Sequence, residues 1–240
     1  IGQFSKIYIK KSIVPVVTPV SSSEKMEEQI NPSELPAIQV SVDDLRIANM
    51  LLGRTELITI PTTVGMKIQK LRTQSALLST SVSGLWQGQG KQQRVALKAQ
   101  VASPDLGKLL ASMQYADMIN RGEVNADIDI FWSGALTDFS LQTISGVLDL
   151  NIKEGQILHV EPGGSGRVLG LFSLAEIPRR LSLDFSDFFG KGFAFKKMSG
   201  HFNFAHGKAN TDNFLITAPA ADIKISGTTD YLTQQFNQVV

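Results

Sequence analysis

Three histidines are the side chains of this sequence best suited to bind a metal or transfer a proton near neutral pH. His201 and His206 lie five residues apart, and His159 stands in the stretch ILHVEPGG beside one acidic residue, Glu161. A metal site needs several ligands that converge on one point, and these spacings indicate no such convergence. We therefore expect turn or surface histidines, with neither a metal site nor histidine catalysis.

Two pairs of carboxylates could supply the acid and base of a glycosidase. Asp149 and Glu154 form one pair, and Asp184 and Asp187 flank Phe185 in the stretch LDFSDFF. An apolar environment raises the pKa of a carboxyl group, as a general acid requires. LDFSDFF is also typical of a loop whose aspartates accept hydrogen bonds from backbone amides, and we favour that interpretation.

Motifs for covalent or cofactor chemistry do not occur in the sequence. There is no nucleophile elbow or dinucleotide fingerprint, and the nearest feature to a phosphate-binding loop is the glycine-rich stretch from Gly163 to Gly166. Such a stretch more often gives a helix a flexible start than binds phosphate. We therefore expect no cofactor.

The composition is that of a folded chain without strong charge. Its 240 residues are 42% hydrophobic, and its formal net charge is +1. The paired cations Lys10-Lys11, Arg179-Arg180 and Lys196-Lys197 are scattered, so we do not expect nucleic acid as a partner. Because cysteine is absent, disulfides and thiolate chemistry are excluded.

The two ends of the chain indicate a piece of a longer protein. The N-terminus, IGQFSKIYIKK, has neither an initiator methionine nor the apolar region of a signal peptide, and the C-terminus stops within an expected strand. No run approaches the roughly 20 apolar residues of a membrane-spanning helix. We therefore expect a fragment.

Apolar and polar residues alternate along most of the sequence. A period of two is typical of antiparallel strands with one apolar side and one solvated side. The alternation includes Val40, Val42, Ile128, Ile130, Leu148, Leu150, Phe202, Phe204, Ile223 and Ile225. We expect a mainly β fold.

Turn residues and a polar segment divide this pattern. Gly155 in KEG and Gly207 in AHG stand where a tight turn favours a positive φ angle, and Gln87 to Gly90 form a looser turn. Serine, charge and proline in residues 21–36 indicate a linker or loop. We therefore expect an N-terminal strand region (1–20), this linker (21–36) and one β domain (37–240).

Two segments change to the period of a helix. After Ser103-Pro104-Asp105, apolar residues recur at helical spacing from Leu106 to Met113. The second segment, Gly166 to Pro178, includes Val168, Leu169 and Phe172 and has little polar face. We expect two short helices, of which the second must be covered by protein, lipid or both.

A Ser-Gly dipeptide recurs in five of the expected strands. The copies are Ser83-Gly84, Ser133-Gly134, Ser145-Gly146, Ser199-Gly200 and Ser226-Gly227. Glycine within a strand commonly marks a bulge or the close approach of another chain or ligand. We therefore expect an elongated sheet of roughly a dozen strands that bends repeatedly and curls into a trough.

Seven phenylalanines gather between Leu183 and Phe204. We expect Phe193 and Phe195 on one strand, and Phe202 and Phe204 on the matching face of the next. The four rings could form cross-strand pairs in a core, or a wall that faces an apolar ligand. The spacing alone leaves both possibilities open.

The run GRVLGLFSLAEIPRRLSLDFSDFFGKGFAFKKMSGHFNFAHGKANTDNFLITAPAADIKISGTTD, Gly166 to Asp230, closely resembles the C-terminal region of the YhdP proteins, in the AsmA-like superfamily of Gram-negative bacteria. The upstream stretches LPAIQVSVDDLRIANMLLGRTEL, SGLWQGQG, SPDLGKLLASMQY and GQILHVEPG resemble earlier blocks of that region. The resemblance extends over about Leu35 to Val240 and is loose before Leu35.

The resemblance implies a curled β-groove that carries phospholipids between membranes, as in chorein-type bridge proteins, and it implies no enzyme activity. It further implies a large periplasmic protein, anchored in the inner membrane, whose C-terminal part lies toward the outer membrane. The residues expected to line the groove are Val40, Val42, Ile128, Ile130, Leu148, Leu150, Phe193, Phe195, Phe202, Phe204, Ile223 and Ile225. The second helix, with Val168, Leu169 and Phe172, would plug the groove or contact a membrane.

Two other functions compete with lipid transport. A β-scaffold would dock an outer-membrane partner through its apolar face and would have a closed, dry core. An envelope hydrolase would use Asp184 and Asp187 and would place their carboxylates in a cleft.

Overall fold

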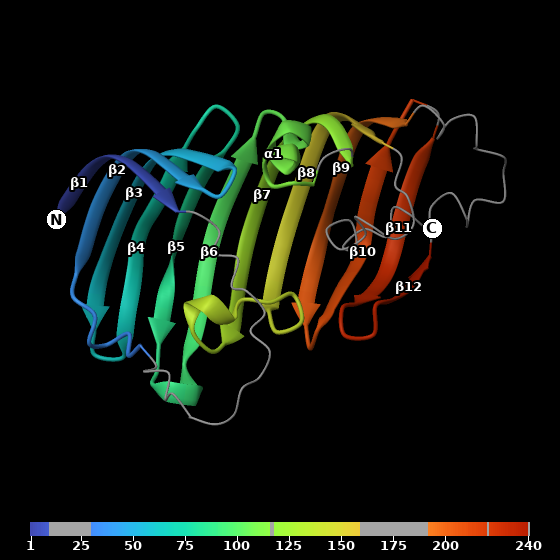
Figure 1. The fold of residues 1–240 in the computed structure, drawn as a ribbon. Helices are drawn as coiled ribbons and strands as arrows, with labels where there is room; N and C mark the ends of the chain where they lie inside the picture. Colours follow the sequence, from blue (N-terminus) through green and yellow to red (C-terminus); the bar gives the residue numbers. More distant parts are fainter. Residues whose placement is uncertain (10–29, 116–117, 159–191, 220, 240) are drawn as a thin grey trace, which may run out of the picture.

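The computed structural model describes residues 1–9, 30–115, 118–158, 192–219 and 221–239. These residues form one sheet of twelve strands that follow one another in chain order (Figure 1). The strands are β1 (Gly2–Ile9), β2 (Ile38–Ile47), β3 (Met50–Thr62), β4 (Gly65–Gln74), β5 (Ser79–Gln87), β6 (Arg94–Ser103), β7 (Ile119–Ser133), β8 (Ser145–Ile157), β9 (Phe193–Ala205), β10 (Lys208–Thr217), β11 (Asp222–Asp230) and β12 (Gln235–Val239). The mainly β, elongated and curled sheet expected from the sequence is confirmed.

The sheet is mixed rather than wholly antiparallel. Consecutive strands are antiparallel from β2 onward, whereas β1 pairs with β2 in parallel, with Gly2 opposite Val40 and Ile9 opposite Ile47. A parallel pair requires a connection of about a dozen residues or more. The long stretch of chain between Ile9 and Ile38 meets that requirement, and β1 thereby belongs to the same sheet as the rest.

One α-helix occurs among the described residues, α1 (Leu106–Ser112), close to the bounds expected for the first helix. Asp105 caps it, because its Oδ1 accepts a hydrogen bond from the Lys108 amide at 3.0 Å. Short 3-10 turns, η1 (Gly90–Gln92) and η2 (Leu136–Asp138), follow β5 and β7. The second expected helix, Gly166 to Pro178, lies outside the described residues.

Four of the five Ser-Gly glycines lie where a neighbouring strand approaches closely, whereas Gly134 follows the end of β7 and lies against Asp138 in η2. A Cβ atom at Gly146 would stand 2.1 Å from the carbonyl oxygen of Asp129 on β7, and one at Gly227 would stand 2.2 Å from that of Asn237 on β12. Both glycines have a φ angle of +131°, which side chains rarely permit. The predicted close approach is therefore made by the adjacent strand.

The two predicted turn glycines have different outcomes. Gly207 lies in the turn between β9 and β10 with a φ angle of +73°, as expected. Gly155 instead lies inside β8, where a Cβ atom would stand 2.4 Å from the ring of Phe195. The prediction of a turn at Gly155 is wrong because the glycine makes room for a ring on the neighbouring strand.

The phenylalanines also pair differently from the expectation. Phe193, Phe195, Phe202 and Phe204 all lie on the single long strand β9. Two consecutive exposed lysines, Lys196 and Lys197, separate the buried Phe195 from the buried Met198, so the apolar face continues past them. The cross-strand neighbours of these rings are consequently on β8 and β10, and Phe202 packs against Phe214 with ring centroids 5.5 Å apart.

Candidate functional site

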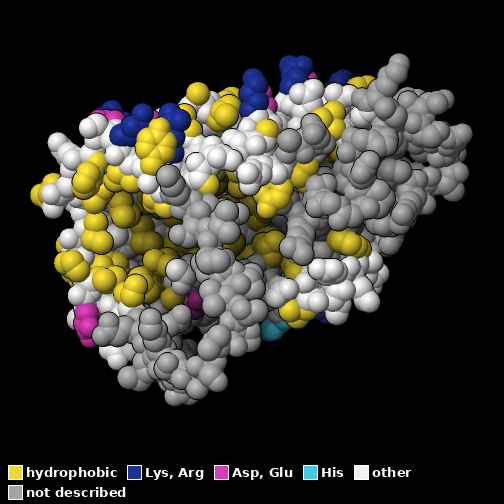
Figure 2. All heavy atoms as spheres, viewed as in Figure 1, with side chains coloured by type: hydrophobic (Ala, Val, Ile, Leu, Met, Phe, Trp, Pro, Cys, Tyr) yellow, Lys and Arg dark blue, Asp and Glu magenta, His cyan; other side chains and the backbone are white. Residues whose placement is uncertain are grey.

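One face of the sheet is apolar across most of its strands. A row of opposed residues, one from each strand between β2 and β8, runs across it, and we call these residues the central row. The central row consists of Val40, Leu57, Leu71, Val82, Ala99, Ile128 and Leu148. Every member is half-buried. Figure 2 shows hydrophobic side chains lining a hollow over the N-terminal strands of this face.

The exposure of this face changes along the sheet. Leu148 of the central row lies opposite Phe202 on β9, and the Phe202 side chain is 1% exposed. Farther along, Phe214 is 1% exposed and Ile216 is fully buried. The central row is therefore half-buried over β2 to β8, whereas the apolar face is buried at Phe202, Phe214 and Ile216 on β9 and β10.

All twelve residues expected to line a groove belong to this face. Nine of them form or pack against one hydrophobic cluster: Ile130, Leu148, Leu150, Phe193, Phe195, Phe202, Phe204, Ile223 and Ile225. Val40 and Ile128 lie in the central row, and Val42 follows Val40 by two residues on β2. The register brings the twelve together, whereas Val168, Leu169 and Phe172 lie outside the described residues.

Period-two counting missed several members of the apolar face. Leu57 and Leu71 pair directly between β3 and β4, and Val82 lies opposite Leu71 on β5. In the stretch KIQKL the apolar residues Ile68 and Leu71 are three residues apart, and the pairing of β4 with β5 shifts register between them. Polar threonines weaken the pattern, since Thr55 and Thr73 occupy the same face beside this row. The period of two is therefore interrupted on these strands, and counting it could not find Leu57 and Leu71.

Helix α1 bounds one end of the apolar face. Leu109 packs with Leu52 and Leu78 in a second small cluster, and Leu110 joins the main one. A Cβ atom at Gly107 would stand 2.5 Å from the carbonyl oxygen of Ile119, so the helix lies directly on β7. The backbone hydrogen bond from Lys108 holds the pKa of the Asp105 carboxyl below its ordinary value and keeps the capping carboxylate ionised.

Two tryptophans mark the opposite end of the strands. Trp86 Nε1 donates to Gln93 Oε1 at 2.9 Å, and Gln93 Nε2 donates to the carbonyl oxygen of Ile30 at 2.7 Å. Trp132 Nε1 donates to the carbonyl oxygen of Ala135 at 2.8 Å. Each indole thus satisfies its donor while burying its ring at the end of the apolar face.

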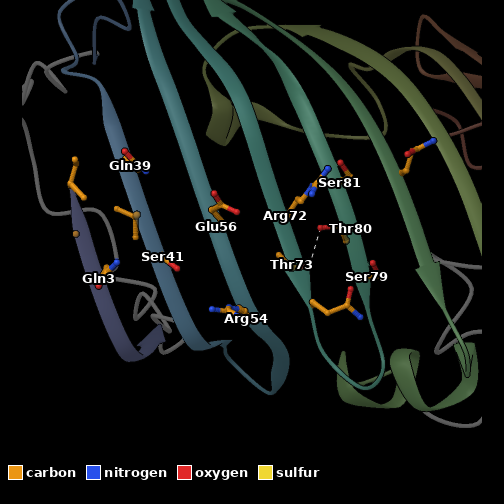
Figure 3. Close-up of a pocket in the computed structure, with 15 residues that line it drawn as sticks. Gln3, Gln39, Ser41, Arg54, Glu56, Arg72, Thr73, Ser79, Thr80 and Ser81 are labelled. Carbon is orange, nitrogen blue, oxygen red and sulfur yellow. Dashed lines mark hydrogen bonds between the residues drawn. The ribbon is translucent and has the colours of Figure 1, made fainter.

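The other face of the sheet is polar. Gln3, Ser41, Glu56, Arg72 and Ser81 lie opposite one another across β1 to β5, and Figure 3 shows them side by side. They contribute to a hollow of about 760 Å³. Lys70 Nζ pairs with Glu56 at 2.6 Å, and Lys98 pairs with Asp129 farther along. The sheet therefore separates an apolar side from a solvated one.

The candidate catalytic residues do not assemble a site in the described part of the chain. Asp149 faces His201, with Oδ1 2.7 Å from Nδ1, on the polar face, and His206 lies in the turn before Gly207. Asp149 and Glu154 are five residues apart on β8, roughly 16 Å, which exceeds the spacing of a glycosidase pair. No group of three potential metal ligands occurs among the described residues. His159, Asp184 and Asp187 lie outside them.

None of the helices in the described ranges is long and apolar enough to cross a membrane. A curled open sheet with an apolar hollow on one face and polar side chains on the other defines a groove-forming β protein.

The chain belongs to the YhdP family, because the model of the YhdP protein family matches residues 2–240. The intermembrane phospholipid transporter YhdP of Escherichia coli (strain K12) is 24% identical over 222 residues. The match covers 90% of this chain and 17% of that protein, so the chain spans about a sixth of the relative's length. No solved structure gives a significant match. The resemblance seen in the sequence is thus confirmed at the level of the family.

Proposed function

We propose that this chain forms a section of the path along which phospholipids move between the inner and outer membranes. The central row carries the proposal. It gives seven half-buried apolar positions on consecutive strands, and at about 4.8 Å per strand it extends over about 29 Å. An acyl chain occupies about half of a 30 Å hydrocarbon layer, so it fits along the row.

The mechanism is passive shielding. Exposing an acyl chain to water costs about 0.8 kcal/mol per methylene, on the order of 10 kcal/mol for a whole chain. A continuous apolar floor removes most of that cost at each step, while the headgroup stays in solvent. No bond is made or broken, and we expect the chain to act without a cofactor. The relative's function as an intermembrane phospholipid transporter supports the same assignment.

The twelve predicted residues have two roles in this proposal. Val40, Ile128 and Leu148 lie in the central row and contact acyl chains. The packed residues of β9 to β11, led by Phe202, close the C-terminal end of the groove. The segment with Val168, Leu169 and Phe172 would act as a plug or membrane contact, a role based on the sequence alone.

The proposed setting follows the family. The complete protein would be anchored in the inner membrane of a Gram-negative bacterium, and this periplasmic segment would lie toward the outer membrane. A scaffold that docks an envelope protein is the second candidate. The packing over β9 to β11, where Phe202 and Phe214 are each 1% exposed, favours that candidate for the C-terminal strands.

Two residues of β7 on opposite faces of the sheet provide the test. Ile128 lies in the central row, whereas Phe131 lies on the polar side, 38% exposed, beneath the guanidinium of Arg94. An aspartate among acyl chains costs about 2.5–3.5 kcal/mol. We therefore expect Ile128→Asp to reduce bound lipid at least roughly tenfold, and Phe131→Asp to leave it unchanged.

The measurement is native mass spectrometry with lipid extraction on the purified chain, after circular dichroism has shown that both variants are folded. A folded wild type that carries no phospholipid would favour the scaffold. Equal lipid loss in both variants would remove the central row from the path.

A further inference from the structure

The polar face of the sheet has a hollow that takes no part in the proposed lipid path on the opposite face. The hollow has a volume of about 760 Å³ and extends over strands β1 to β6 (Figure 3). We call it the polar hollow; its side chains include those of Gln3, Gln39, Ser41, Arg54, Arg72 and Ser81. Sites for small ligands commonly have volumes of about 300–1,000 Å³, so the polar hollow is large enough to hold one.

The strand register brings the side chains of the polar hollow together. Gln3 on β1 lies opposite Ser41, which lies opposite Glu56 on β3. Arg72 on β4 lies between Glu56 and Ser81 on β5. From β2 to β5, the strand neighbour of each of these residues belongs to the central row. Because neighbouring side chains on a strand point to opposite faces, these side chains point away from the apolar face.

Several polar groups in the hollow are free to bind a ligand. Gln3, Gln39 and Arg72 are exposed, and none of the three makes a side-chain hydrogen bond or ion pair with any other residue that the structure describes. Glu56 lies opposite Arg72 but pairs with Lys70 at 2.6 Å instead. The Arg72 guanidinium therefore offers an uncompensated positive charge and several hydrogen-bond donors.

Arg54 is a second cation in the polar hollow. Its guanidinium lies 4.0 Å from Asp43, and both side chains are more than two-thirds exposed. An exposed ion pair of this kind contributes little free energy, so Arg54 can exchange Asp43 for an anionic ligand. The polar hollow thus favours a ligand that has at least one negative group.

The remaining lining residues restrict the chemistry of that ligand. Apart from Ile1 and Val40, the polar hollow is lined by glycine, serine, threonine, glutamine, arginine and glutamate. An apolar ligand would find little to contact, and a nucleic acid would find no aromatic ring for its bases among these lining residues. Strands β2 to β5 are hydrogen-bonded on both sides, so they have no free edge for an extended peptide.

A sugar chain that carries carboxylates fits this lining. Side-chain amides and hydroxyls both donate and accept hydrogen bonds, as the hydroxyl groups of a sugar do. A guanidinium binds a carboxylate through two parallel hydrogen bonds, which adds geometric specificity to the charge attraction.

The hollow surface continues beyond the polar hollow along the same face. Ser81 and Gln100 also line a hollow of about 330 Å³ that reaches Asp149 on β8, and one of about 340 Å³ continues from there to His201 on β9. At about 4.8 Å per strand, the series from β1 to β9 extends over about 38 Å. That length suits a chain of several sugar units better than a single unit.

We propose that the polar hollow binds an oligosaccharide that carries carboxylates, with one carboxylate on Arg72 and sugar hydroxyls on the neighbouring glutamines and serines. The ligand lies on the face of the sheet opposite the central row, so this inference goes beyond the proposed function and does not depend on it.

The experiment measures sugar binding to the purified chain by isothermal titration calorimetry. The acidic probe is a hyaluronan tetrasaccharide, in which glucuronate alternates with N-acetylglucosamine, and the neutral probe is chitotetraose. Arg72→Gln removes the proposed carboxylate contact. Lys67→Gln is the matched control, because Lys67 is an exposed cation on the same face of β4 that does not line the polar hollow. Circular dichroism establishes that both variants are folded.

We expect the hyaluronan tetrasaccharide to give saturable binding to wild type and to Lys67→Gln. Arg72→Gln should weaken it roughly tenfold, as the loss of a hydrogen bond between charged groups implies. Chitotetraose should bind wild type more weakly than the acidic probe, and salt at about 1 M should weaken only the acidic probe, since the screening length falls to about 3 Å. Bound phospholipid should be the same in Arg72→Gln and wild type, which separates this test from that of the groove.

Four results would overturn the proposal. Absence of saturable binding by both tetrasaccharides would exclude a sugar site in the polar hollow. Equal affinity of wild type for the two probes would remove the carboxylate contact. Equal losses in Arg72→Gln and Lys67→Gln would assign the binding to general charge attraction. Monomeric glucuronate that binds as tightly as the tetrasaccharide would assign the hollow to a small acid rather than a sugar chain.

Discussion

Replacement of Phe202 by alanine tests whether the phenylalanines of β9 pack against protein or against a removable ligand. The Phe202 side chain is 1% exposed, lies opposite Leu148, and packs against Phe214 at 5.5 Å between ring centroids. Truncating a buried phenylalanine typically costs about 3–5 kcal/mol, from lost burial and the cavity that remains. We therefore expect Phe202→Ala to lower the free energy of unfolding by about 4 kcal/mol in lipid-free protein.

Phe131→Ala is the control for this change. The Phe131 ring is 38% exposed on the polar face and contacts the Arg94 guanidinium at 4.2 Å. Its loss should cost about 1 kcal/mol, mainly the cation–π contact and part of the buried area. The two variants should thus differ by about 3 kcal/mol.

Urea unfolding followed by circular dichroism measures this difference. With a urea dependence of about 3 kcal/mol per molar, the midpoints of the two variants should lie about 1 M apart. If Phe202→Ala lost no more stability than Phe131→Ala, the Phe202 ring would not be packed against protein. The phenylalanines would then form the wall of a ligand site, and our distinction between the half-buried central row and the packed residues of β9 would be wrong.

Two further predictions concern the bends of the sheet and the cap of α1. Gly146→Ala should destabilise the chain by about 3 kcal/mol or more, because the methyl group would stand 2.1 Å from the Asp129 carbonyl oxygen at a φ angle of +131°. The control, Ser145→Ala, should be nearly neutral in thermal unfolding. Equal melting temperatures for the two variants would refute the close approach. Asp105→Asn should reduce the loss of stability on acidification between about pH 5 and pH 2. The hydrogen bond from the Lys108 amide lowers the pKa of Asp105, so the stabilisation by its carboxylate is present above the ordinary pKa and disappears as the pH falls through the pKa of the folded state. Melting curves with the same acid dependence in wild type and variant would contradict this.

Much of the sheet could be predicted because its signals are local. Alternation of Val40 and Val42, or of Ile128 and Ile130, reports which side chains share a face, and the register confirms that they do. The start of α1 could also be predicted from the sequence, since Asp105 caps the helix through a hydrogen bond with a residue only three positions away. A division of the chain at residues 20 and 36 stays a prediction.

The sequence by itself determined that this protein is a β-sheet with one apolar and one polar face, because a period of two follows from strand geometry alone. Only the tertiary structure decided which strands are neighbours: it placed β1 parallel to β2 and put Lys153 opposite Lys197. It also decided that Ile128 is half-buried while Phe202 is enclosed. Local periodicity names a face, but pairing, register and coverage depend on residues far apart in the chain.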